Sequence, residues 1–159
     1  MSQVDMVREV GGPEARVECF HRMLERRVED WLATGEARCV PCAGLYRHLP
    51  GLFLFLTRVA LDPRVPEVER RGVLAALKYV VAPFDLIPEG IVGTIGFRDD
   101  LVLAALIVDR LYSEVPADVL AEHWSTAGDP RTIARAVLTA AAEMVGPDLC
   151  DQLLDWLPR

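Results

Sequence analysis

Four carboxylates lie within one short apolar stretch of this chain, residues Tyr79–Asp100, whose sequence is YVVAPFDLIPEGIVGTIGFRDD. They belong to Asp85, Glu89, Asp99 and Asp100. An unpaired charge in an apolar interior is costly, so these acids are expected to cap helices, form ion pairs or bind ligands. Carboxylate oxygens are the donors that hard cations such as Mg²⁺ and Ca²⁺ prefer. The stretch is therefore the first candidate site in the sequence.

Helix capping accounts for these acids without any ligand. Asp99 and Asp100 precede an apolar run at Leu101–Leu111, where they would accept backbone N–H bonds and meet the positive end of the helix dipole. Asp85 would cap a short turn at residues 86–89. Pro83 and Pro88 would fix the chain on both sides of this turn, while Gly90, Gly93 and Gly96 permit tight bends or close helix approach. In this interpretation the segment is a polar turn between two buried helices.

Cation binding is the competing interpretation. The four carboxylates would converge on one divalent ion, with Lys78 and Tyr79 supporting the ligands from nearby, while Arg98 would neutralise a neighbouring acid. Their spacing matches no known metal-binding loop. The two interpretations differ in geometry, because the carboxylates face helix ends in one and face each other in the other.

A second set of reactive residues is the C-x-P-C tetrad at Cys39 and Cys42. Together with His48 these cysteines offer three zinc ligands, and His21 or Cys19 would be the fourth if the first helix folds back. In thioredoxin-like proteins such a tetrad begins a helix that follows a strand, and the helix dipole lowers the thiol pKa. The segment before this tetrad has a helical pattern instead. A reduced pair without a ligand is the simplest interpretation, and a zinc site and a redox pair are the alternatives.

The composition of the 159-residue chain restricts its class. The formal net charge of −7 disfavours contact with nucleic-acid backbones, so no nucleic-acid partner is expected. The N-terminal residues lack the apolar core of a secretory signal, which favours a cytoplasmic location. Charged residues and two prolines break the longest apolar window, Val80–Val108, so no transmembrane helix is expected. The apolar run Leu52–Leu56 would be costly to expose to water, which keeps peripheral membrane contact as an alternative.

Proline residues mark where helices begin, because proline is favoured at the first helical position. Segments with helical periodicity follow Pro13, Pro50, Pro66, Pro116, Pro130 and Pro147. The clearest start is Asp129-Pro130, where a good N-cap residue precedes the proline.

Apolar residues recur at helical spacing through most of the chain. Such stripes comprise Val17, Phe20, Leu24, Val28 and Trp31; Val73, Leu74, Leu77, Val80 and Val81; Ile133, Val137, Ala140, Ala141 and Met144; and Leu149, Leu153 and Leu157. The run Leu101–Val108 is apolar on every side and is expected to be the central helix. No segment shows the alternation of a half-buried strand. The sequence therefore predicts one all-α domain, residues 1–159, a compact bundle of about six or seven helices with a Pro/Gly-rich acidic turn.

Four motifs follow one another between residues 61 and 100. They are L-D-P-R-V-P from Leu61, A-A-L-K-Y from Ala75, P-F-D-L-I-P from Pro83 and G-F-R-D-D from Gly96. In these motifs residues 50–112 resemble the YkvA-like domain of unknown function, a small helical family widespread in bacteria. Helical extensions at 1–45 and 115–159 lie outside the likeness. The chain departs from the family at Glu89, where Asp is frequent, and at Arg98, where a more apolar residue is frequent.

The resemblance implies a helical core with a polar turn, and association with membranes, since relatives also occur attached to membrane-spanning segments. It implies no reaction. The candidate binding residues are those of the signature: Lys78, Tyr79, Pro83, Asp85, Pro88, Glu89, Gly96, Arg98, Asp99 and Asp100.

No recognisable catalytic constellation stands out in the sequence, and its terminal helices carry a surplus of apolar residues. We therefore predict a non-enzymatic helical protein that acts by binding a protein partner or a second copy of itself. No cofactor is expected. The alternatives are a divalent-metal-dependent hydrolase that uses the four carboxylates of the acidic stretch, and a peripheral membrane-associated protein.

Overall fold

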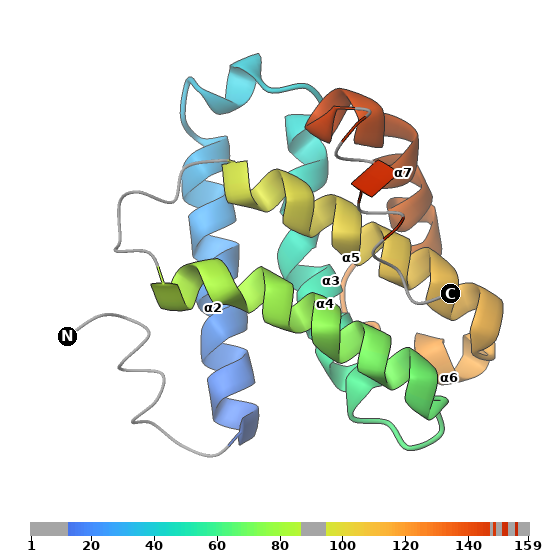
Figure 1. Cartoon of the computed structure of the whole chain (residues 1–159). Coiled ribbons are helices and arrows are strands. Elements are labelled where there is room, and N and C mark those ends of the chain that lie inside the picture. Colours follow the sequence, from blue (N-terminus) through green and yellow to red (C-terminus); the bar gives the residue numbers. More distant parts are fainter. Residues whose placement is uncertain (1–12, 87–94, 147, 149–150, 153–154, 156–159) are drawn as a thin grey trace.

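The computed structural model describes residues 13–86, 95–146, 148, 151–152 and 155 of the chain. These residues form helices and connections, with no strand among them (Figure 1). The α-helices are α2 (Pro13–Leu32), α3 (Leu49–Ala60), α4 (Glu67–Leu86), α5 (Ile95–Glu114), α6 (Ala117–Ala121) and α7 (Pro130–Val145). The 3₁₀ helices η1 (Ala37–Cys39) and η2 (Ala43–His48) connect α2 to α3. The predicted all-α class is confirmed.

Proline residues do mark the helix starts. The starts predicted at Pro13, Pro50, Pro66, Pro116 and Pro130 each agree with the structure to within one residue. At the start of α7 the Asp129 carboxylate accepts hydrogen bonds from the backbone N and the Oγ1 of Thr132, both at 2.8 Å. These bonds satisfy a backbone donor that the first helical turn leaves without a partner. The start predicted at Pro147 lies outside the described residues.

α5 is the central helix of the fold. It contacts α3, α4 and α7, and Figure 1 shows α4 and α5 running alongside each other. Every residue from Leu101 to Val108 is at most 7% exposed. The prediction of a helix buried on all sides is therefore confirmed.

The predicted apolar stripes of α2 and α7 face this core. Their buried members are Leu24, Val28, Trp31, Ile133, Val137, Ala141 and Met144. The stripe predicted for α4 is only partly right, because Val73 is 1% exposed whereas Leu74 is 45% exposed. Successive helical residues are turned by about 100°, so a helix that directs Val73 and Ala76 inward directs Leu74 outward.

The start of α5 corrects the capping role predicted for two acids. α5 begins at Ile95, which makes Asp99 and Asp100 its fifth and sixth residues. An N-cap residue lies before the first helical turn, so the predicted N-cap role is wrong. Apolar periodicity located only the buried part of the helix, because the first turn contains Gly96 and Arg98 and lacks an apolar stripe.

The end of α4 corrects the predicted break at Pro83. α4 extends to Leu86, so Pro83 lies inside the helix and Asp85 lies in its last turn. A proline inside a helix removes one backbone hydrogen bond and crowds the carbonyl group four residues earlier, at a cost of about 3 kcal/mol, yet α4 continues through it. The turn that Asp85 was expected to cap, residues 86–89, falls mostly outside the described residues.

The apolar run Leu52–Leu56 lies in α3 and faces the interior. Leu52, Phe53, Phe55 and Leu56 are each at most 6% exposed. This burial explains why the run is so apolar, and peripheral membrane contact stays a prediction. Among the described residues, no helix is long and apolar enough to cross a membrane.

Replacing Leu103 by alanine is expected to destabilise the fold. Leu103 is 1% exposed at the centre of α5, and truncation of such a leucine leaves a cavity that costs about 3 kcal/mol. For a chain of this size the melting temperature should fall by roughly 10 °C. The matched control is Leu74→Ala on α4, which should change stability by no more than about 0.5 kcal/mol because the side chain is 45% exposed. Equal destabilisation by both substitutions in urea unfolding would contradict the assignment of α5 as the central helix.

Candidate functional site

The side chains of residues 79–99 lie outside the part of the chain that the structure describes. The signature residues affected are Tyr79, Pro83, Asp85, Pro88, Glu89, Gly96, Arg98 and Asp99. Asp100 is described and is only 2% exposed within α5. Lys78, at the other end of the signature, is exposed on α4. The predicted convergence of four carboxylates therefore stays a prediction, with Asp100 as its one described and buried acid.

The described residues contain a polar cluster centred on Asp62, in the connection between α3 and α4. The Asp62 side chain is 5% exposed. Its Oδ1 accepts a hydrogen bond from the Arg64 backbone N at 2.8 Å, and its Oδ2 accepts one from Arg64 Nη2 at 2.8 Å. His123 Nε2 lies 2.7 Å from the same Oδ2. A nearly buried carboxylate is thus satisfied by partners from two distant parts of the sequence.

Arg64 joins this carboxylate to a second one. Its Nη1 and Nη2 donate to Glu122 at 3.2 and 2.6 Å, in the paired geometry typical of a guanidinium and a carboxylate. Hydrogen bonds from the Arg64 side chain, then from its backbone N–H and from His123, hold the pKa of Asp62 far below its usual range. The Arg64 side chain likewise lowers the pKa of Glu122. Both carboxylates are therefore ionised at neutral pH.

The cluster connects the α3–α4 connection to the segment that follows α6. Arg58, near the end of α3, adds two bonds to the same segment, from Nη1 to the His123 carbonyl oxygen at 3.3 Å and to Ser125 Oγ at 2.9 Å. Charged hydrogen bonds therefore fix the position of α6 relative to α3 and α4.

Apolar packing reinforces this attachment. The Trp124 ring meets the Phe55 ring edge to face, with centroids 5.7 Å apart. Gly51 of α3 permits a close approach, because a Cβ at this position would lie 3.0 Å from Thr126 Oγ1. The loop before α7 is thus packed directly on α3.

The cluster resembles a catalytic His–Asp pair only in part. Ionised Asp62 accepts a hydrogen bond from His123 Nε2–H, and this bond fixes the imidazole tautomer and the orientation of the ring. The same carboxylate is also held by Arg64, and Ser125 Oγ is bonded to Arg58 rather than to the imidazole. The geometry is that of a structural ion-pair network, which positions α6.

Sequence reasoning missed this cluster as a unit. Asp62 and Arg64 belong to the L-D-P-R-V-P motif, and their spacing across a proline was the available signal. Such a spacing suits an Asp side chain that accepts from the backbone N–H two residues later. The contribution of His123 could not be found in the same way, because it lies 61 residues from Asp62.

A second ion pair joins α4 to α5. Glu69 is 8% exposed in its side chain, and it accepts from Arg110 Nε at 2.8 Å and from Arg110 Nη2 at 3.0 Å. The Glu69 carboxylate raises the pKa of Arg110 through these bonds. The pair therefore joins α4 and α5 through a nearly buried carboxylate.

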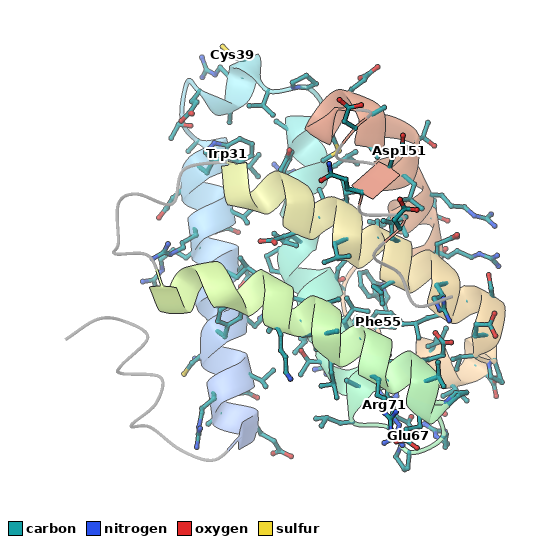
Figure 2. The ribbon with its side chains drawn as sticks, viewed as in Figure 1. Trp31, Cys39, Phe55, Glu67, Arg71 and Asp151 are labelled. Atoms are coloured by element: carbon teal, nitrogen blue, oxygen red, sulfur yellow. The ribbon has the colours of Figure 1, made fainter. Side chains whose placement is uncertain are left out.

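The C-x-P-C tetrad spans the break between the 3₁₀ helices η1 and η2. Cys39 ends η1, whereas Cys42 precedes η2 in the left-handed conformation at φ 57°, ψ 30°. Val40 between them is extended, at φ −92°, ψ 127°, so the two cysteines do not share one helical turn. Cys39 lies at the tip of the α2–α3 connection, and both thiols are exposed (Figure 2). A redox tetrad instead places its cysteines together at the start of a helix.

Metal ligands do not gather elsewhere in the described residues. Among them, no group of three or more His, Cys, Asp or Glu side chains is placed to hold a metal ion. Cys39, Cys42 and His48 are all described, so the three-ligand zinc set predicted from their spacing is not assembled. Burial lowers the pKa of His48, which is half-buried at the end of η2.

Comparison with known proteins places a family likeness on the α4–α5 region. Residues 70–106 match the sequence profile of a family described as "Protein of unknown function (DUF1232)". This span includes the acidic signature and the start of the buried part of α5, and it excludes the Asp62 cluster. No solved structure matches the chain.

Two curated proteins are similar over parts of the chain. "Uncharacterized protein ORF9" of Methanothermobacter thermautotrophicus is 29% identical over 77 residues, which make up 48% of this chain and 53% of that protein. "E3 ubiquitin-protein ligase RNF170" of Danio rerio is 40% identical over 52 residues, which make up 31% of this chain and 20% of that protein. The chain thus spans about half the length of the first relative and about a fifth of the second.

Asp62→Asn is expected to lower the stability of the fold at neutral pH. It should also weaken the dependence of that stability on pH. The folded protein holds the pKa of Asp62 below the value near 4 of an unfolded chain, so its contribution is complete above pH ~4. That contribution is lost as the pH falls through the folded pKa. The stability difference between wild type and variant should therefore be largest at pH 6 to 7 and shrink towards pH 2.

Urea unfolding followed by circular dichroism at several pH values measures this difference. Asp118→Asn is a suitable control, since Asp118 lies in the first turn of α6, outside the Asp62 cluster. A constant difference across the whole pH range would contradict an ionised Asp62 at the centre of the network.

Proposed function

We propose that this chain is a non-enzymatic helical module that acts by binding a protein surface, either a partner protein or a second copy of itself. One observation carries the proposal. The large apolar side chains that are most exposed among the described residues are Leu61 at 71%, Val68 at 58% and Leu74 at 45%. All three lie between the end of α3 and the middle of α4, so the exposed large apolar side chains of the described residues are concentrated in one region.

The polar clusters of the described residues support a binding role over a catalytic one. Asp62, Glu69 and Glu122 are each held by an arginine side chain at 3.2 Å or less. Carboxylates in such pairs stabilise a fold, whereas a general base or a metal ligand needs a lone pair directed at its substrate or metal.

The matches to parts of two other proteins support a module that occurs within proteins of different length. A stretch of 52 residues matches about a fifth of a protein named as an E3 ubiquitin-protein ligase, and a stretch of 77 residues matches about half of "Uncharacterized protein ORF9". We also propose that the family likeness extends over residues 50–112 as a YkvA-like domain, since the profile match at 70–106 falls within that range.

A photo-crosslinking residue at position 74 is expected to form covalent adducts with a bound protein in cells. The same residue at position 22 is the control, because Arg22 on α2 has a side chain that is 75% exposed outside the apolar region. Adducts at 74 should exceed those at 22, and Val68→Ser in the same chain should reduce them. Stability should change by no more than about 0.5 kcal/mol, because Val68 is an exposed position. Equal adduct yields at the two positions, or none at position 74, would refute the proposed function.

A further inference from the structure

α4 presents one continuous exposed stripe, which we call the α4 face. Its members are Glu67, Val68, Arg71, Leu74, Ala75 and Lys78, all of them exposed. They recur at alternating steps of three and four residues, so they lie along one side of the helix. Figure 2 shows Glu67 and Arg71 together at the start of α4, near the edge of the molecule. This side is opposite to the one that directs Val73 into the core.

Charge is distributed unevenly along the α4 face. Its first member is the acid Glu67 and its last is the base Lys78, and the apolar residues Val68, Leu74 and Ala75 lie between them. Arg71 is bonded to Glu67 within the same helix. The face therefore carries an acid paired with Arg71 at its N-terminal end, the apolar residues Leu74 and Ala75 in its middle and the base Lys78 at its C-terminal end.

We propose that the α4 face binds the α4 face of a second copy in antiparallel orientation, about a twofold axis at the level of Gly72 and Val73. This inference rests on the proposed function and identifies its partner. In that register Glu67 lies opposite Lys78 of the second copy, and Lys78 lies opposite Glu67 of the second copy. Arg71 lies opposite Leu74 of the second copy in the same way. A twofold axis repeats each of these contacts, as expected for a self-complementary interface.

Charge complementarity selects the antiparallel orientation. A parallel pairing would place Glu67 against Glu67 and Lys78 against Lys78, and like charges at such distances repel. The antiparallel pairing converts both repulsions into attractions and buries the apolar middle of each face. The aliphatic part of the Arg71 side chain covers Leu74 while its guanidinium stays in water, bonded to Glu67.

The size of the α4 face determines the expected affinity of the dimer. Protein interfaces built from one short helix face lie at the small end of the known range, so the dimer should be weak and reversible. Its end contacts are exposed ion pairs, which salt screens within roughly 10 Å at 0.1 M ionic strength. Dimerisation should therefore depend on both protein concentration and salt.

Sedimentation velocity of the full chain over a range of concentrations tests the pairing. Wild type should show a concentration-dependent dimer that weakens in high salt. Glu67→Lys and Lys78→Glu should each weaken the dimer by roughly tenfold or more, because each reversal makes both end contacts repulsive. Glu18→Lys is the matched control, since the Glu18–Arg22 pair on α2 has the same side-chain exposures, 67% and 75%, as Glu67–Arg71.

Mixing the two weakened variants gives the sharpest result. In a mixed dimer the lysine introduced at position 67 of one chain faces the glutamate introduced at position 78 of the other. The unchanged Glu67 and Lys78 also face each other, so both contacts are attractive again. The mixture, and the chain that carries both substitutions, should recover the wild-type dimer. A mixture that stays monomeric would overturn the proposed register, and so would a dimer that neither reversal weakens.

This test separates the inference from the proposed function. If wild type stays monomeric at every concentration while position 74 still crosslinks to another protein, the second copy is excluded and the binding function stands. If wild type is monomeric and position 74 forms no adducts, both are refuted. Melting temperatures of all variants should agree within a few degrees, which confirms that each one folds.

Discussion

The fold depends on one constraint, the burial of α5 on every side. A helix that is apolar all around cannot lie on a surface, so other helices must cover each of its faces. Here α3, α4 and α7 supply that cover. The small residues Ala134 and Ala141 of α7 are fully buried, which permits close approach to α5. The outer helices therefore pack so that their apolar faces cover α5, and their polar faces point to solvent.

Ion pairs then fix what apolar packing leaves free. Apolar burial itself is not directional, whereas hydrogen-bonded ion pairs are, so they add to side-chain packing in fixing the register of the helices. Glu69 and Arg110 hold α4 against α5, and the Asp62 cluster holds α6 to the α3–α4 connection. Arg64 and His123 act as shared partners in that cluster. These polar residues stabilise the fold, whereas the most exposed large apolar side chains of the described residues lie between the end of α3 and the middle of α4.

The family profile covers only one part of this fold. The shared profile covers the α4–α5 region, so the buried helix and its immediate partner are the common element. The Asp62 cluster and α7 lie outside that profile and complete the core in this chain.

Local patterns in the sequence determined the all-α class, the helix starts and the central helix. Proline and N-cap preferences act within one turn, and apolar periodicity acts within one helix, so a linear pattern records them. Only the tertiary structure decided which polar residues meet. His123 reaches Asp62 across 61 residues of sequence, and Leu74 lies outside although its neighbour Val73 is buried. The acidic signature shows the same limit of local patterns. Its last two acids, Asp99 and Asp100, were predicted to cap a helix, but α5 begins at Ile95 and contains both of them. Contacts between elements depend on how helices rotate and pack around α5, and no single segment of the sequence contains that information.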